Sequence, residues 1–550
     1  MSSTHEKRLL RRAELVRRLT ELAPRHRLDA MLEEVDGKAL VRSLPAEDVY
    51  STIIDVGLAD STEIVQLATP EQFRTFVDLA AWQRDRMDPL EVLHWLRAAR
   101  GDDDDDFVKK VRSLDIEVLE LIFKKLTVIH DLEETPDVDT QGVTMEMAEG
   151  RYLLEFRIDG VDEAALRRLT YDLTTHNPFE LSRFLEAVRW EAITELEEAA
   201  YQFRKARLED LGFPPLEEAL KVFAWVDPAK VGGQTRTAST AITPAAGGHV
   251  DYVAAAFRGL DSVERQNLEG EVRYLVNCVL VADGAEPGDP VAVKRLSEHA
   301  RDYLDLGLEH YTGGEPDRAV DVVRETTLRA LFQCGFSLTL KLKRQAEKLL
   351  HEEGSRFAET WLALDEESAA LAALLRRRPL KALKVPGAEP VPFRSRRELA
   401  ECEATLARVR QQKIVFQALL GASPAEVIAR FGLKLSELTP QRMFAAVVAR
   451  AELDEQIVVE PFAELKLTEL TTRIFEDTGS SAALRASAGR RALAALQSKL
   501  EVNASELEVM VNRVLQTFVA DFGPQWQKDG RVTKEKITVL PVTGVVPLPA

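Results

Sequence analysis

A recurring helix signature constrains the fold of this chain more than any other feature of its sequence. The stretch SLPAEDVYSTIIDVG (Ser43–Gly57) places Pro45 in a first helical turn, where its fixed φ and missing N–H suit the position. Glu47 follows at the positive end of the helix dipole, and apolar residues then recur at helical spacing until a glycine ends the pattern. The stretch therefore predicts one amphipathic helix of about three turns.

The same signature recurs downstream. It appears in TPEQFRTFVDLAAW (Thr69–Trp82), in DPLEVLHWLRAAR (Asp88–Arg100) and, without proline, in SLDIEVLELIFKKLTVI (Ser113–Ile129). Each copy opens with a Thr, Asp or Ser cap and carries an acidic residue in its first turn. Short amphipathic helices must stack on one another to bury their apolar stripes. Residues 36–134 are therefore expected to form a superhelix of imperfect helical repeats.

Two resemblances attach to particular segments. The pieces LPAEDVYSTIIDVG, TPEQFRTFVDL and LDIEVLELIFKKL resemble the repeated helices in the cytosolic N-domain of MgtE-type magnesium transporters, which is similar in fold to the FliG-type helical superhelix. This resemblance implies a helical fold and does not imply transport, because neither paired CBS modules nor membrane spans follow. The pieces FRKARLEDLGFP (Phe203–Pro214), LGLEHYTGG (Leu306–Gly314) and LFQCGFSLTLKLKRQA (Leu331–Ala346) resemble a family of large uncharacterised bacterial proteins labelled as a domain of unknown function. The second resemblance implies a domain layout and no activity.

Length and composition narrow the class of protein. A chain of 550 residues exceeds the size at which one hydrophobic core stops growing, which predicts about two to four structural units. The net charge of -19 argues against general binding to nucleic acid, because neutralising phosphates requires a surplus of Lys and Arg. The three cysteines are isolated from one another, which indicates small core residues rather than disulfides or a zinc site.

The sequence favours a cytoplasmic location. Its longest apolar run, Tyr274–Ala282, is well short of the ~20 residues that a membrane span needs. The charges near the N-terminus are not followed by an apolar segment or by a cleavage site of small residues. We therefore expect neither a transmembrane helix nor secretion.

The expected fold class is mainly all-α, a multi-unit helical superhelix or bundle, because helical periodicity resumes after each connector. Partial alternation around a Glu-Gly turn adds an expected short β-hairpin near 143–158. The expected layout is a basic N-terminal helix (1–35), the helical repeats (36–134), the hairpin with a helical unit (143–226), a linker (227–248), a second helical unit (249–376), a basic Pro-containing connector (377–396), a third helical unit (397–528) and an extended tail (529–550).

Two charged segments each allow more than one interpretation. The acidic run GDDDDDF (Gly101–Phe107) lacks the alternating spacing that converges metal ligands on one point, so a solvated loop is favoured over weak attraction of Mg²⁺ or Ca²⁺. The N-terminal segment Glu6–Leu22 pairs a basic face with an apolar stripe. Docking on the acidic body of the chain or a loose solvated helix is favoured for it, and the alternatives are a protein partner and a lipid or nucleic-acid surface.

The sequence carries no familiar catalytic or cofactor signature. It lacks a Walker A loop, GxGxxG, HExxH, GxSxG and an EF-hand loop, and its nine histidines form no HxH or HxxxH group. We therefore expect no cofactor and no metal site, and no catalytic residue can be nominated.

The segment ELEEAAYQFRKARLEDLGFP (Glu195–Pro214) holds the candidate site. On a helix, one apolar stripe that includes an arginine consists of Leu196, Ala200, Phe203, Arg207 and Leu211. The neighbouring row on the same helix consists of Glu197, Tyr201, Arg204 and Leu208. Arginine within an apolar stripe is costly unless a carboxylate or a phosphate meets its guanidinium. An internal ion pair at a helix junction is favoured, and a phosphorylated or acidic ligand is the alternative. The candidate ion-pair or anion site comprises Arg204, Arg207, Tyr201 and Glu197.

The expected function follows from this architecture. Solenoid-like helices offer extended binding surfaces, and no catalytic signature competes with that role. A protein–protein interaction scaffold or adaptor with protein partners is therefore the favoured hypothesis. Two alternatives stay open, namely a regulatory protein that responds to divalent cations and an enzyme with an unrecognised pocket near Arg204, Arg207 or Tyr303.

Overall fold

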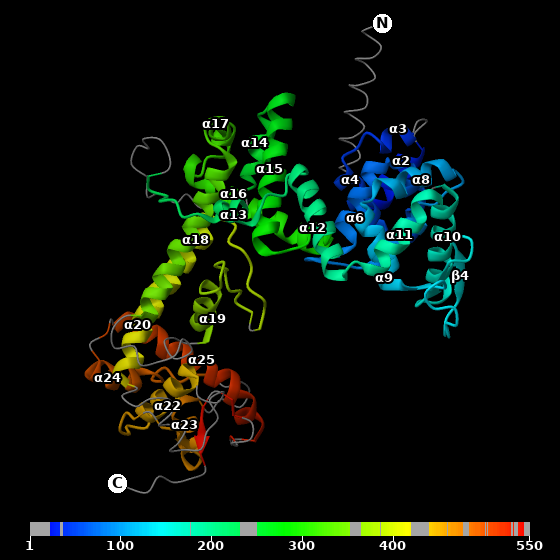
Figure 1. Ribbon diagram of the computed structural model, residues 1–550. Coiled ribbons are helices and arrows are strands. Elements are labelled where there is room, and N and C mark those ends of the chain that lie inside the picture. Colours follow the sequence, from blue (N-terminus) through cyan, green and yellow to red (C-terminus); the bar gives the residue numbers. More distant parts are fainter. Residues whose placement is uncertain are drawn as a thin grey trace. The chain divides into compact units, whose positions relative to one another are not determined.

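Helices dominate the computed structural model of the chain, which confirms the mainly all-α fold class (Figure 1). The chain divides into two compact units, one formed by Met1–Val222 with Gln266–Ala300 and the other by Phe223–Arg265 with Arg301–Ala550. The structure describes residues 22–33, 37–176, 178–230, 250–351, 365–385, 387–419, 439–458, 460–476, 483–500, 502, 504–529, 532, 537–538 and 540–543.

Three predicted segments fall mainly outside the described residues. They are the basic helix at 1–35, the linker at 227–248 and the tail at 529–550. In the part of the chain that is described, no helix combines the length and the apolarity that crossing a bilayer requires. The finer layout of units and connectors stays a prediction.

Short helices joined by short turns open the first unit (Figure 1). They are α2 (Pro24–Glu33), α3 (Gly37–Val41), α4 (Ala46–Val56), η1 (Leu58–Asp60), α5 (Thr62–Leu67), α6 (Pro70–Ala80), the two-residue strands β1 (Trp82–Gln83) and β2 (Arg86–Met87), α7 (Pro89–Ala99), α8 (Asp104–Ser113) and α9 (Ile116–Leu126). Thr69 forms a capping box with Gln72 at the start of α6, and Asp88 accepts a hydrogen bond from the Leu90 N–H at the start of α7. These caps act locally, which is why the sequence reveals them.

The second half of the acidic run lies in a helix, so its prediction as a solvated loop is wrong for residues 104–107. Asp103 accepts a hydrogen bond from the Asp106 N–H, and α8 begins inside the run. Carboxylates stabilise the positive end of a helix, which compensates for their mutual repulsion. Asp106 is further engaged by Arg42 at 2.9 Å and by Lys110 at 2.6 Å.

The helix predicted over Ser113–Ile129 is also shorter than expected, because α9 ends at Leu126. Thr127–Asp131 instead forms strand β3, in which three consecutive β-branched residues favour the extended backbone. The apolar stripe of α9 continues into these residues, so helical periodicity alone cannot reveal where the helix stops.

A three-stranded antiparallel sheet follows α9, with β3 (Thr127–Asp131), β5 (Tyr152–Phe156) and β4 (Thr144–Met147) in that order across the sheet. Strands β4 and β5 form the hairpin that was expected near 143–158. Alternate residues of β5 are buried, namely Tyr152, Leu154 and Phe156. They share one face of the sheet with the odd-numbered residues of β3.

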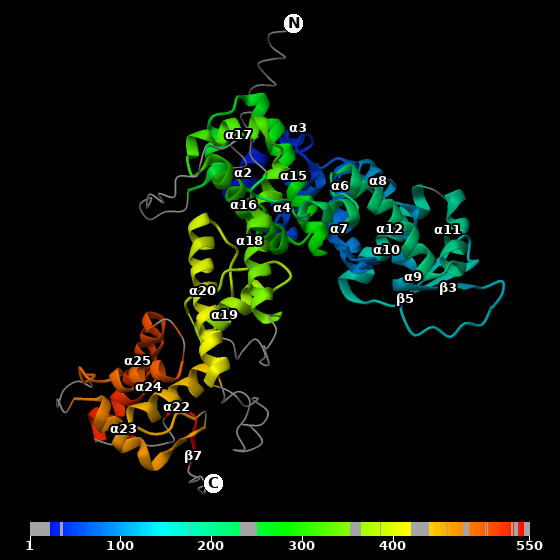
Figure 2. The same cartoon turned by 90° about the vertical axis from the view of Figure 1, so that its left-hand side faces the viewer.

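Further helices complete the first unit (Figure 2). They are α10 (Gly160–His176), α11 (Pro178–Trp190), α12 (Ile193–Asp210) and α13 (Leu216–Leu220), together with the parts of α15 (Ser262–Asp283) and α16 (Pro290–Thr312) that belong to Gln266–Ala300. Helix α9 packs against both α11 and α12. An edge-to-face contact between Phe123 and Phe184, with ring centroids 5.2 Å apart, fixes the α9–α11 pair.

The second unit contains the remaining described elements. They are α14 (Tyr252–Arg258), η3 (Pro316–Arg318), α17 (Ala319–Glu325), α18 (Leu328–His351), α19 (Asp365–Leu374), α20 (Arg396–Leu419), α22 (Pro440–Glu452), the parallel pair β6 (Phe462–Ala463) and β7 (Val542–Thr543), η6 (Glu464–Lys466), α23 (Leu467–Ile474), α24 (Arg490–Lys499) and α25 (Ala504–Asp529), and η2 (Lys221–Phe223) spans the boundary between the units. Helices α22, α24 and α25 lie side by side around a buried apolar core (Figure 2). In the same unit, the buried carboxylate of Glu367 pairs with Arg408 and Arg513.

Candidate functional site

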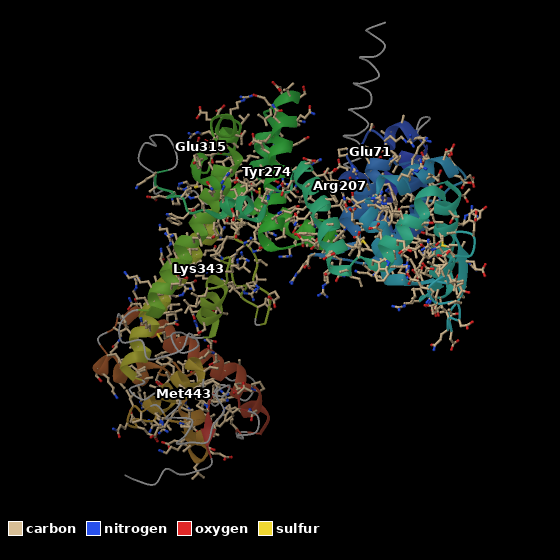
Figure 3. The ribbon with its side chains drawn as sticks, in the orientation of Figure 1. Glu71, Arg207, Tyr274, Glu315, Lys343 and Met443 are labelled. Atoms are coloured by element: carbon tan, nitrogen blue, oxygen red, sulfur yellow. The ribbon has the colours of Figure 1, made fainter. Side chains whose placement is uncertain are left out.

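The predicted arginine cluster lies on α12 in the first unit (Figure 3). Its buried row consists of Leu196, Ala200, Arg204 and Leu208. Phe203 was predicted within the buried stripe and is 50 % exposed, so that assignment is wrong. The sequence predicts the spacing of the stripe correctly and misplaces it around the helix, because the side on which α9 and β2 pack is decided by the tertiary structure.

Arg207 bridges two carboxylates from other helices. Its Nε and Nη2 donate to the carboxylate of Asp78 on α6 at 2.7 and 2.8 Å. Its Nη1 and Nη2 donate at 3.0 and 2.7 Å to Asp115, the N-cap residue of α9. Burial alone lowers the pKa of Arg207, but the hydrogen bonds to both carboxylates raise it above its ordinary value. The guanidinium thus joins α6, α9 and α12.

Arg204 is 3 % exposed and is directed at groups of its own unit. Its Nε donates to the Asp78 carbonyl at 2.7 Å, and its Nη2 pairs with Glu286 at 3.1 Å. The guanidinium also lies 5.3 Å from the ring centroid of Trp82, next to which the Tyr201 ring packs at 6.2 Å. These contacts describe a filled helix junction rather than an open anion site.

The remaining predicted residue of the cluster, Glu197, faces a different neighbour. It accepts a hydrogen bond from Lys125 Nζ at 2.5 Å, and the same ammonium group donates to the Met87 carbonyl at 2.8 Å. The carboxylate of Glu197 is therefore engaged by α9 and by the end of β2, whereas the two arginines are engaged by Asp78, Asp115 and Glu286. In the second unit, Tyr303 is buried with edge-to-face contacts to Phe332 and Phe336.

A surface groove that the sequence did not predict borders the sheet of the first unit. It has a volume of about 400 Å³ and is built from α9, β3, the residue that follows β5, and the junction between α11 and α12. Its lining includes Lys124, Ile129, Arg157, Arg189, Trp190 and Ile193. Among the described residues no acidic side chain lines it, although the chain has a net charge of -19. We call it the β3 groove.

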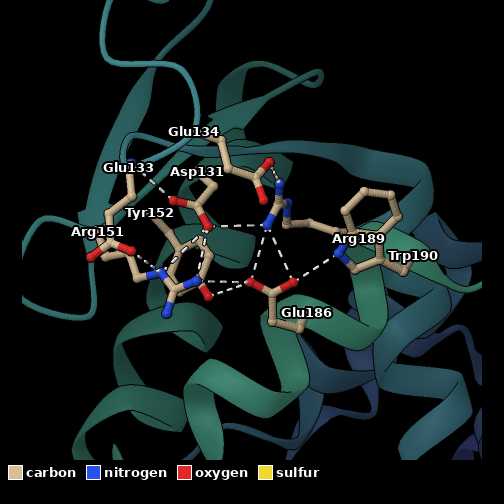
Figure 4. Close-up of polar contacts among 8 residues, drawn as sticks. All are labelled: Asp131, Glu133, Glu134, Arg151, Tyr152, Glu186, Arg189 and Trp190. Atoms are coloured by element: carbon tan, nitrogen blue, oxygen red, sulfur yellow. Dashed lines mark hydrogen bonds and ion pairs between the residues drawn. The ribbon is translucent and has the colours of Figure 1, made fainter.

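A network of charged residues holds one wall of the β3 groove (Figure 4). The Arg189 guanidinium donates to Asp131 at 3.2 Å, to Glu186 at 3.0 Å and to Glu134 at 2.6 Å. The hydroxyl of Tyr152 donates to Glu186 at 2.5 Å. Burial, reinforced by this hydrogen bond, raises the pKa of Tyr152 to about 12, so the phenol stays protonated as a donor.

Asp131 is the centre of that network, because its side chain is fully buried and accepts from two arginines. Burial would raise its pKa, but the hydrogen bond from Arg151 and the field of Arg189 outweigh burial and lower it. The carboxylate therefore stays ionised and keeps both guanidinium groups in place.

Trp190, at the end of α11, is 73 % exposed and nevertheless held in position (Figure 4). Its Nε1 donates to Glu186 at 2.9 Å, and the guanidinium of Arg189 lies 5.3 Å from its ring centroid. A fixed, exposed tryptophan loses little conformational entropy when a partner covers it, which is typical of binding hot spots. Ile193, 40 % exposed, extends the same apolar surface.

Two cations give the β3 groove its positive field. Lys124 Nζ donates to the carbonyls of Val188 and Arg189 at 2.7 and 2.8 Å, which caps the C-terminal end of α11. Neither Lys124 nor the exposed side chain of Arg157 has a carboxylate partner among the residues described. The Lys124 ammonium is thus met by the carbonyl end of α11, whereas the Arg157 guanidinium is exposed at the groove.

Glu120, one turn before Lys124 on α9, is a buried carboxyl group with an unusual pKa. It is 7 % exposed, and burial together with Glu191 and Glu117 raises its pKa to about 7. Within the described ranges, no cluster of three or more His, Cys, Asp or Glu residues could hold a metal ion. The pKa of Glu120 is thus raised by its burial, by Glu117 on the same helix and by Glu191, which follows α11.

The sequence contained a weak signal for strand β3, which borders the groove, and no signal for the exposure of Trp190. The β-branched run in TVIHD favours a strand, but the apolar stripe of α9 outweighs it when periodicity is read alone. Nothing local distinguishes Trp190 from an ordinary core residue on α11. Its exposure depends on where α11 ends relative to the sheet.

Comparisons with known proteins give one match. No curated protein and no solved structure matches this chain. Residues 4–535 match the model of a family described as "Family of unknown function (DUF6178)". The resemblance to the MgtE-type N-domain gains no support from these comparisons and stays a prediction.

Proposed function

We propose, for a chain that belongs to this family of unknown function, the role of a protein–protein interaction scaffold that binds a partner at the β3 groove. The observation that carries the proposal is the position of Trp190, exposed beside a groove and fixed by a hydrogen bond to Glu186. A tryptophan in this state offers a large apolar surface at low entropic cost. Its burial by a protein partner would stabilise the complex.

The state of the predicted clusters supports this role over the two alternatives. The arginine cluster on α12 is met by carboxylates and carbonyls of its own unit, which leaves it poorly suited as a substrate pocket. In the acidic run, Asp103 caps α8 and Asp106 pairs with Arg42 and Lys110, so these two carboxylates serve the fold, which favours the scaffold over a cation sensor.

The experiment compares two aromatic surface changes in one unit. Full-length protein carrying Trp190→Ala is affinity-purified from the native cell and its interactors are quantified by mass spectrometry. Tyr171→Ala is the matched control, because Tyr171 is 52 % exposed on α10 and does not line the β3 groove. We expect specific interactors to be depleted at least tenfold by Trp190→Ala and retained by Tyr171→Ala. An interactor profile that Trp190→Ala leaves unchanged contradicts the proposal.

A further inference from the structure

Strand β3 is an edge strand with half of its backbone directed away from the sheet. The hydrogen bonds from the Arg157 N–H to the Leu126 carbonyl and from the Leu132 N–H to the Arg151 carbonyl delimit its ladder with β5. In an antiparallel ladder, alternate residues direct both backbone groups at the partner strand. The even-numbered residues of β3 therefore face β5, while Thr127 and Ile129 face outward.

Most of the outward backbone groups of Thr127 and Ile129 are unpaired among the described residues. Thr127 uses its N–H to donate to the Phe123 carbonyl at the end of α9. The Thr127 carbonyl and both backbone groups of Ile129 have no hydrogen-bond partner in the described chain. An unpaired strand edge is a template for strand addition, and here it borders the β3 groove.

The two faces of β3 differ in chemistry. The face of Asp131 and Tyr152 is the α11 side, because Asp131 contacts Arg189 and Tyr152 contacts Glu186. The exposed Trp190 lies at the end of α11 on that side. This face of β3 therefore favours apolar side chains in a bound segment. Arg157 is paired with Leu126, so its side chain lies on the opposite face of the sheet. That face therefore favours carboxylates in a bound segment.

We propose that the β3 groove binds an extended peptide segment of a partner protein, in which acidic and apolar residues alternate, as an additional strand on β3. The segment pairs with both backbone groups of Ile129 and with the Thr127 carbonyl. Its apolar side chains cover Trp190 and Ile193, and its carboxylates meet Arg157. This inference rests on the proposed function and names the chemistry of the partner.

The wall opposite the strand is preorganised for such a segment. Arg189 links α11 to Asp131 at the end of β3, so the tryptophan and the strand edge keep a fixed spacing. Rigid walls reduce the entropy that binding costs, which allows a short segment to bind. Backbone hydrogen bonds then supply affinity, and alternate side chains supply specificity.

The test uses full-length protein and a fluorescein-labelled heptapeptide in which glutamate alternates with isoleucine or valine. Fluorescence anisotropy gives the Kd for this peptide, for a version with lysine in place of glutamate, and for a version with N-methylated backbone amides. We expect saturable binding of the acidic peptide, at least tenfold weaker binding of the lysine peptide, and no binding of the N-methylated peptide.

Two variants locate the binding on β3. Ile129→Pro removes a backbone N–H that points away from β5. The ladder with β5 therefore keeps all its hydrogen bonds, whereas a bound peptide loses one hydrogen bond to β3. We expect the melting temperature to be kept within a few degrees and the affinity to fall at least tenfold. Arg157→Glu is the second variant, used if Ile129→Pro does not fold. It should weaken binding of the acidic peptide and strengthen binding of the lysine peptide.

The inference is overturned if folded wild-type protein does not bind the acidic peptide, or if it binds the N-methylated or the lysine peptide equally well. It is also overturned if Arg157→Glu leaves the preference between the two charged peptides unchanged. In these cases a loss of interactors in Trp190→Ala would still support the scaffold role. Failure of the strand-addition proposal can therefore be distinguished from failure of the scaffold proposal.

Discussion

Arg189 Nη1 and Asp131 Oδ2 lie 3.2 Å apart and join the end of α11 to the end of strand β3. The Asp131 side chain is fully buried and Arg189 is mostly buried, so this contact is shielded from solvent. It places Trp190 beside the free edge of β3. Together with the hydrogen bonds from Lys124 to the end of α11, this ion pair sets the geometry of the β3 groove.

Replacing Asp131 with asparagine should lower the melting temperature and impair the groove. An amide keeps the size of the side chain but removes the charge that holds Arg189 and Arg151. Because the pKa of Asp131 is lowered on folding, its contribution is present above the unfolded pKa of Asp, roughly 4, and is lost as the pH falls through its folded pKa. Thermal melts at neutral and at strongly acidic pH should therefore differ more for the wild type than for Asp131→Asn. Equal pH dependence of both proteins would refute this role.

Arg207→Ala should destabilise the protein by about 3–5 kcal/mol, because it leaves the buried carboxylate of Asp78 without its partner. Asp78→Asn in the same chain should recover part of the loss, since no buried charge remains. Arg97→Ala is the control, because Arg97 is half exposed and its contact with Asp162 should contribute less than about 0.5 kcal/mol. Chemical denaturation measures all three. A loss for Arg207→Ala no larger than that for Arg97→Ala would contradict the buried bridge.

Glu120→Gln should stabilise the protein at alkaline pH and change little in mild acid. The folded state raises the pKa of Glu120 to about 7, so folding favours its protonated form. Wild-type stability should therefore fall as the pH rises from the unfolded pKa of Glu through the folded value. Above that value the neutral amide should gain about 1–3 kcal/mol over the carboxylate. Glu191→Gln should give a smaller gain, because it removes only one neighbouring charge. A pH-independent difference would argue against an ionising Glu120.

Two glycine substitutions should have opposite effects. A Cβ at Gly335 on α18 would lie 1.9 Å from the Tyr303 carbonyl oxygen on α16, so Gly335→Ala should force these helices apart and lower the melting temperature strongly. Gly270 on α15 is exposed, and a methyl group there would meet no described atom within 4 Å, so Gly270→Ala should stabilise the helix by about 0.5–1 kcal/mol. Melting curves of the two variants settle the point, and a tolerated Gly335→Ala would exclude the close approach.

Local chemistry was readable along the chain. Proline at the helix start, the Thr69 and Asp88 caps and the apolar spacing predict α4, α6 and α7, because each signal acts within one or two helical turns. Pro45 is the N-cap residue of α4, so its predicted place in the first turn is wrong. The β4–β5 hairpin is equally local, since its turn joins adjacent strands. The sequence also identified Arg204 and Arg207 as arginines that need partners, but it could not name Asp78, more than a hundred residues earlier.

The helical class, the caps and the costly arginines of α12 could be predicted from the residues alone, because they follow from backbone geometry and from the desolvation of single residues. Three features became visible only in the folded chain: Phe203 is exposed, α9 ends where β3 begins at Thr127, and the backbone groups of Ile129 are unpaired within the described chain. Each of these depends on which segment packs alongside, and burial and strand pairing are properties of two surfaces that meet. The β3 groove exists only because α11 ends beside β3, where Arg189 reaches Asp131.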